Sequence, residues 1–347
     1  MTEEAGSNIV PTSPDENEGS DGWWSVAVDA IGATVGKLPA VISRNVAKAF
    51  NHLLKIPNTW VDGKAAEIKA NSDARVALIK ATGKSIAKQI TVDPSIAAIA
   101  ADTHASKILR QTVNTAKVLQ QTAQDLQQQP PPADQPIPEI TDDWLNAFEQ
   151  EAANMSSEHM QKLFGKILAG EIRKPTSYSI RTLKLMAQLD NRPAALFQRL
   201  CSLACTLSLG SHVHDSRVIT LSGAAASNGL QGFGLGFSEL NILFEYGLII
   251  GDYNSYMMYV GCIVNERNMV SMPFTYQNQL FALAPKTPMT PQQRIDFKVS
   301  GVQLSRAGME LLGIVDIEED PKYTQGLMSY FDSHGFNVLP VAMPPTA

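Results

Sequence analysis

Five prolines fall within one short stretch of the chain, at positions 130, 131, 132, 136 and 138 of QQQPPPADQPIPEITDD. A proline fixes φ and lacks the backbone N–H, so such a run continues neither a helix nor a central strand. It forms an extended, semi-rigid connection instead. We therefore predict a linker over residues 129–140 that divides the chain into two parts.

The distribution of charge follows this division. Residues 1–22 carry six acidic residues and no Lys or Arg, and their Pro- and Ser-rich composition predicts a disordered acidic head. Residues 23–128 contain 13 basic and 7 acidic residues, whereas the part from residue 129 onward contains 15 and 21. A basic segment between two acidic ones indicates an anionic partner, either nucleic acid or a membrane surface. It equally suits docking onto the protein's own acidic part or onto another copy.

Three cysteines in 347 residues do not make a disulfide framework, which favours a reducing compartment. No signal peptide opens the sequence, and no run approaches the roughly 18 apolar residues that a spanning helix needs. We expect a cytoplasmic protein, with the surface of the inner membrane as its second location.

Residues 23–57 are the most apolar part of the N-terminal half and predict an amphipathic helical hairpin broken at Pro39. This pattern suits a helix in a membrane interface, and equally a helix pair that packs on the rest of the chain. The residues expected to contact a membrane or partner are Trp23, Trp24, Arg44, Lys48, Phe50 and Lys55.

Residues 59–128 consist largely of good helix formers and are interrupted at Val92–Pro94. They predict two long Ala-rich helices that bury a narrow seam, as is common in self-association arms. Residues 23–128 are thus interpreted as a basic helical arm.

Residues 141–210 predict a compact helical module with short turns. Its central element is MSSEHMQKLFGKILAGEIRKP, Met155 to Pro175, which has a serine cap, an apolar stripe and a Gly/Pro stop. Two further helices follow, and the apolar stripe of the second is predicted to run as far as Leu207.

Residues 211–347 predict an α+β module that resembles a winged helix. A possible strand at 213–219 is followed by a helix, the sequence GLI, a strand, a polar turn and another strand, and later by a helix over VSGVQLSRAGMELL. The predicted fold class is mainly α with a smaller α+β part: long N-terminal helices, a compact helical module and a C-terminal winged-helix-like module.

The stretch from Met155 to Asp190 resembles the signature of a bacterial family known only as a domain of unknown function. It is also similar to the helical domain of the Abi-alpha (abortive-infection-like) family. The resemblance implies an intracellular bacterial protein, and the similarity to Abi-alpha implies a link to phage defence. The matching residues are Met160, Leu163, Phe164, Ile167, Leu168, Ala169, Pro175, Ile180 and Leu183.

One set of side chains has the chemistry of a zinc site. Cys201, Cys205, His212 and His214 form C-x3-C-x6-H-x-H, and nitrogen and sulfur ligands suit tetrahedral zinc, although structural sites use tighter cysteine spacing. The apolar sequence around the cysteines favours small buried thiols instead. We assign no metal and no cofactor, and these four residues remain a weak candidate.

No nucleophile and base with a supporting third group can be assembled from local sequence, so we expect a protein that is not an enzyme. The leading hypothesis is an intracellular interaction protein in a stress or anti-phage response, binding a protein partner or itself. The first alternative is a membrane-acting effector that uses residues 23–57. The second is a winged-helix DNA-binding regulator, which is disfavoured because the predicted helices offer Glu239 and Glu245 but only Arg306 as a cation.

Overall fold

The computed structural model describes residues 40–54, 77, 81, 94–129, 137–210, 212–267 and 269–342. The predicted acidic head over residues 1–22 lies outside the described residues, as do Trp23, Trp24 and Lys55. The chain separates into two compact units. One comprises residues 1–141 and 152–173, and the other comprises residues 142–151 and 174–347.

The first unit is helical and contains α2 (Ala40–Leu54), α4 (Pro94–Gln128) and α6 (Glu158–Arg173). The apolar periodicity predicted for Met155–Pro175 is confirmed, because Phe164, Ile167 and Leu168 of α6 are completely buried. Gly165 lets α6 approach α4 closely: a Cβ at this position would lie 2.5 Å from Cβ of Gln121. The absence of a side chain here therefore sets the distance between the two helices.

The end of the Pro-rich linker is held on α2. Asn45, which is 1% exposed, donates from Nδ2 to the carbonyl of Pro138 at 3.0 Å, and its Oδ1 accepts from the N–H of Ile140 at 3.3 Å. Arg44 and Lys48 lie 3.5 and 3.8 Å from the carboxylate of Glu139. The buried side-chain amide of Asn45 thus provides hydrogen-bond partners for the backbone of Pro138 and Ile140, which an extended segment outside a sheet would otherwise lack.

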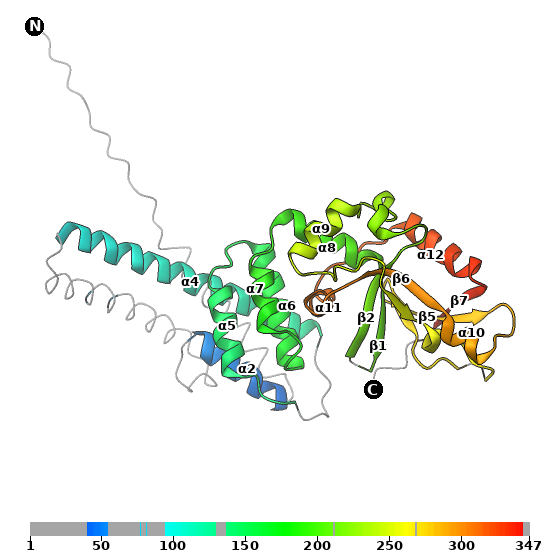
Figure 1. Cartoon of the computed structure of the whole chain (residues 1–347). Helices are drawn as coiled ribbons and strands as arrows, with labels where there is room; N and C mark the ends of the chain where they lie inside the picture. Colours follow the sequence, from blue (N-terminus) through cyan, green and yellow to red (C-terminus); the bar gives the residue numbers. More distant parts are fainter. Residues whose placement is uncertain are drawn as a thin grey trace, which may run out of the picture. The chain divides into compact units, whose positions relative to one another are not determined.

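The second unit combines helices with one sheet (Figure 1). Its helices are α5 (Asp142–Ala152), α7 (Ile180–Ala187), α8 (Asn191–Leu203), α9 (Phe237–Glu245), α10 (Pro291–Asp296), α11 (Arg306–Leu312) and α12 (Pro321–Ser333). Its strands are β1 (Ala204–Leu209), β2 (His212–Ile219), β3 (Tyr256–Met258), β4 (Phe274–Tyr276), β5 (Gln279–Pro285), β6 (Lys298–Gln303) and β7 (Phe336–Val341). Short 3-10 turns lie at Ala225–Ser227, Gln231–Phe233 and Val260–Cys262.

The sheet has seven antiparallel strands in the order β3-β6-β2-β1-β4-β5-β7 and curls into a half-barrel. Helix α12 packs on one of its faces, where the Tyr323 hydroxyl donates to the carbonyl of Ile219 at 2.9 Å. Phe331 of the same helix lies 5.4 Å from Phe274 of β4, measured between ring centroids. These aromatic contacts form the centre of the apolar core of the unit.

The predicted fold class is wrong, because this is an α+β fold and not a mainly helical protein with a winged helix. The strand that was predicted after the polar turn, β3, pairs with β6, with Tyr256 opposite Ser300. Two strands, a 3-10 turn and α10 separate β3 from β6 in the sequence. The prediction rested on elements that follow one another in the sequence, whereas the strand pairs that define this sheet join segments far apart in the sequence.

Two segments that were predicted to be helical form strands. The helix expected over VSGVQLSRAGMELL begins only at Arg306, because Lys298–Gln303 forms β6. The helix expected to reach Leu207 ends at Leu203, and Ala204–Leu209 forms β1. Both strands lie inside the sheet. β1 is buried over most of its length and so lacks the alternation that identifies a half-exposed strand, whereas in β6 the buried Val299 and Val302 have the spacing of a helix face. The possible strand at 213–219 is confirmed as β2.

Candidate binding site

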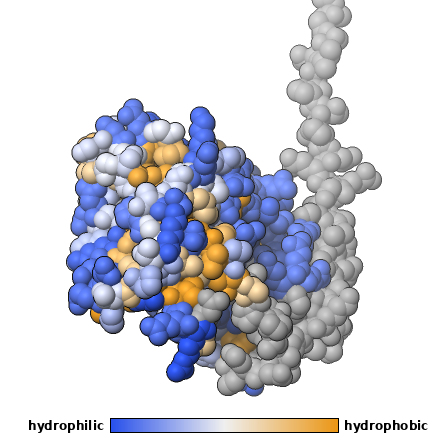
Figure 2. Space-filling model, turned by 90° about the vertical axis from the view of Figure 1, so that its right-hand side faces the viewer, coloured by the Kyte–Doolittle hydropathy of each residue, from blue (hydrophilic) through white to orange (hydrophobic). Residues whose placement is uncertain are grey.

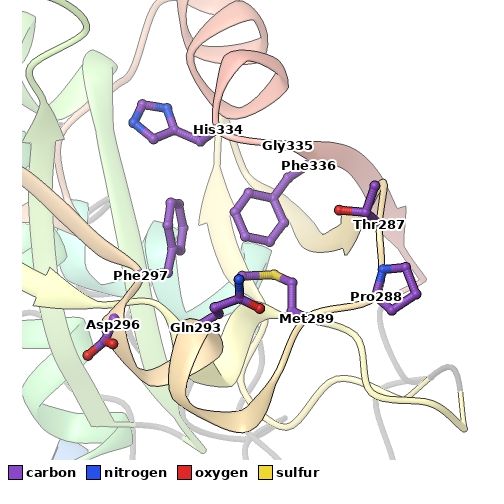
Figure 3. Close-up of a pocket in the computed structure, with 9 residues that line it drawn as sticks. All are labelled: Thr287, Pro288, Met289, Gln293, Asp296, Phe297, His334, Gly335 and Phe336. Carbon is purple, nitrogen blue, oxygen red and sulfur yellow. The ribbon is translucent and has the colours of Figure 1, made fainter.

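An open pocket of about 420 Å³ lies in the second unit where α10, the end of α12 and the start of β7 meet (Figure 3). This volume falls within the range of about 300–1,000 Å³ that is usual for ligand sites. Figure 2 shows this side of the molecule, where apolar residues gather between hydrophilic ones. The residues that line the pocket are Thr287, Pro288, Met289, Gln293, Asp296, Phe297, His334, Gly335 and Phe336.

Two aromatic rings form the wall of the pocket. Phe297 and Phe336 lie 4.5 Å apart, measured between ring centroids, and are tilted by 50°. Both are buried, at 9% and 1% exposure, so neighbouring side chains hold their orientation. The thioether of Met289 adds a polarisable group opposite these rings in Figure 3. The wall is therefore rigid, whereas the rim is exposed.

The start of α10 positions one amide at the pocket. Thr290 accepts from the N–H of Gln293 at 3.3 Å, and the Gln293 side-chain oxygen accepts from the N–H of Thr290 at 2.8 Å. This capping box fixes the side chain of Gln293, because its oxygen is already engaged. Its amide nitrogen is left to donate to a ligand, and it lies beside Met289 in Figure 3.

Two ionisable residues lie at the edge of the pocket. Nδ1 of His334 lies 2.7 Å from the carbonyl of Tyr330, and because a carbonyl oxygen only accepts, this nitrogen is the donor. The imidazole also packs against the Tyr330 ring, with 4.3 Å between centroids. Asp296 accepts from Nε2 of Gln292 at 3.0 Å. His334 is thus oriented by Tyr330 and Asp296 by Gln292, and each of these partners lies one helical turn earlier in the sequence.

The weak zinc candidate is not assembled. Cys201 and Cys205 are buried, and burial raises the pKa of both thiols above the ordinary value. His212 and His214 are exposed at the opposite end of β2 from Arg217, the residue that pairs with Cys205. Among the residues that the structure describes, no three His, Cys, Asp or Glu side chains are grouped so that they could hold a metal ion.

The residues that were predicted to contact a membrane or a partner have different environments in the structure. Phe50 is 1% exposed in the core of the first unit, so it is not available at the surface of this structure. Arg44 and Lys48 both lie beside Glu139, on the end of the linker. Of the helices in the described part of the chain, none is both long and apolar enough to cross a membrane.

Sequence reasoning missed the pocket because its walls come from two separate segments, residues 287–297 and 334–336. The signal that was available is TPQQ, Thr290 to Gln293, which predicts a capped helix start with proline at its first position. That signal locates α10 but does not reveal that the end of α12 lies beside it.

The family described as "Protein of unknown function (DUF2806)" matches residues 103–328, about two thirds of the chain. This match covers most of α4, all of α6 and the second unit as far as α12. Searches of curated proteins and of solved structures gave no match. The comparisons thus support the predicted resemblance to a family of unknown function and give no support to the similarity with Abi-alpha.

Proposed function

We propose that this chain, which belongs to the DUF2806 family, is an interaction protein whose α+β unit binds a protein partner in the pocket between α10 and β7. The observation that carries the proposal is the chemistry of the lining. Its buried wall is formed by the rings of Phe297 and Phe336, and its exposed polar lining combines amide and hydroxyl groups with one imidazole and one carboxylate, which suits the recognition of a partner.

The two ionisable groups at the edge support binding over catalysis. A general base has to reach the proton that it removes and needs a partner that is oriented toward the reacting group. His334 is hydrogen-bonded to the carbonyl of Tyr330 and Asp296 to the amide of Gln292, so the two groups are oriented by different neighbours and not by each other. We therefore assign both residues to the polar rim of a recognition site.

Blocking the pocket is expected to abolish capture of the partner. Thr287 is exposed, so Thr287→Trp fills the pocket with little risk to folding. A photo-crosslinking side chain at position 287 is expected to yield a discrete adduct in cells of the native host, and in an affinity pull-down the T287W variant is expected to lose the protein found in that adduct. The matched control places the same groups at exposed Gln325 of α12, outside the lining. Identical adducts from both positions would refute the proposal.

The wider setting that we propose is a stress or anti-phage response, and it rests on the resemblance of Met155–Asp190 to Abi-alpha. We expect at least one phage of a panel to form plaques about tenfold more efficiently on host cells that lack the protein than on cells with the wild-type chain. The T287W variant should behave like the deletion, and the Gln325→Trp variant like the wild type. Equal plating of every phage on all four strains would refute this setting while leaving the binding proposal intact.

A further inference from the structure

An apolar patch is formed by Phe237 and Phe244 of helix α9 together with Ile250 from the segment that follows it, and these residues are 43%, 50% and 40% exposed. The two phenylalanines are seven positions apart and share one face of the helix. The ring of Phe237 lies 6.0 Å from that of Tyr253, and Phe244 lies over Gly251, where a Cβ would come within 2.9 Å of its ring. Both rings are therefore held at the surface in fixed positions, as anchor residues of an interface are.

Negative charge lies beside this α9 patch. Glu245 follows Phe244 on the same helix, and Asp252 follows Gly251, which lies beneath the Phe244 ring. Both carboxylates are exposed. An apolar centre with an acidic border fits a partner helix that offers apolar side chains together with basic ones.

The chain itself contains a surface of this kind. In the N-terminal half of α4, Ile96, Ile99 and Leu109 are 59%, 68% and 49% exposed. Lys107 and Arg110 are exposed on the same stretch of helix. We call these five residues the α4 face. Isoleucine exposed to this extent at two positions one turn apart leaves a continuous apolar strip in water.

We propose that the α4 face of one copy docks on the α9 patch of a second copy. Charge complementarity supports this occupant, because Lys107 and Arg110 would meet the border formed by Glu245 and Asp252. Pairing two α9 patches would instead bring their acidic borders together. The contact joins two different surfaces, so it is heterologous, and a pair of docked copies still offers one free α9 patch and one free α4 face. The assembly therefore grows with concentration or closes into a ring.

Complementation between two variants tests this directly. Ile99→Glu disables the α4 face, and Phe244→Glu or Phe237→Glu disables the α9 patch, and all three positions are exposed in the single chain. By light scattering after size exclusion, the wild type is expected to exceed the mass of one chain and to grow with concentration. Each variant alone should weaken association by about a hundredfold, because a carboxylate would be buried in an apolar contact.

An equimolar mixture of I99E and F244E is expected to form a two-chain complex, because one intact surface of each kind remains. The control is Leu339→Glu on β7, a residue of similar exposure (41%), which should associate like the wild type. Circular dichroism checks that each variant is folded. A wild type with the mass of one chain at every concentration would overturn the proposal, as would a mixture that stays monomeric. Because none of these positions lines the pocket, either result leaves the proposed function standing.

Discussion

Replacing Asp215 by Ala is expected to destabilise the α+β unit by about 3–5 kcal/mol, since this change leaves a buried guanidinium without its counter-charge. Asp215 and Arg217 are 0% and 1% exposed and lie on the same face of β2. The guanidinium donates from Nε at 2.6 Å and from one terminal nitrogen at 2.7 Å to the two carboxylate oxygens. This bidentate geometry is the strongest form of a side-chain ion pair.

The other terminal nitrogen of Arg217 connects the pair to its neighbours in the fold. It donates to the carbonyl of Ser255 at 2.8 Å and to that of Val299 at 3.3 Å. One side chain therefore joins β2 to β6 and to the residue that precedes β3, at the edge of the sheet. Losing the carboxylate disturbs these contacts as well, because the unpaired charge has to reach water or remain buried at high cost.

Denaturant unfolding followed by circular dichroism measures this loss as a lower midpoint for Asp215→Ala. The double variant Asp215→Leu/Arg217→Met is the informative comparison, because it removes both charges and replaces them with apolar side chains. It should be clearly more stable than Asp215→Ala alone. If the single and double variants unfolded at the same denaturant concentration, the buried charge would not be the cause of the loss.

Local sequence patterns predicted the helices well and the sheet poorly, for one physical reason. Helical periodicity is contained within a segment, so Phe164, Ile167 and Leu168 identified α6 before its neighbours were known. Strand pairing joins distant segments. Val299 and Val302 stand three apart, as on a helix face, yet both are completely buried in β6 on opposite faces of the sheet.

The candidate site shows the same limit. The zinc prediction grouped Cys201, Cys205 and His212 because they are close in sequence, but the β1–β2 hairpin separates the thiols from the imidazoles. The pocket, by contrast, joins Phe297 to Phe336 across 39 positions of sequence. A side chain that packs against a distant ring leaves no local pattern, so only the fold reveals this site.

The second large effect is expected from Gly301, which sits in β6 opposite Ile219 of β2. A Cβ on Gly301 would lie 2.1 Å from the carbonyl oxygen of Val218 and 2.9 Å from its carbonyl carbon. Both are backbone atoms of the neighbouring strand, so no side chain can turn aside to relieve the clash. Gly301→Ala therefore has to push β2 and β6 apart where Arg217 connects them.

We expect Gly301→Ala to cost about 3 kcal/mol or more, at the upper end of what overpacking causes. The measurement is the midpoint of thermal or urea unfolding, read by circular dichroism. Gly313→Ala is the matched control: this glycine follows α11 with an ordinary φ of −70°, and a Cβ there would meet nothing within 4 Å. If the midpoint for Gly301→Ala equalled that of Gly313→Ala, the two strands could separate without a loss in the free energy of unfolding. The close approach of β2 and β6 would then not determine the stability of the half-barrel.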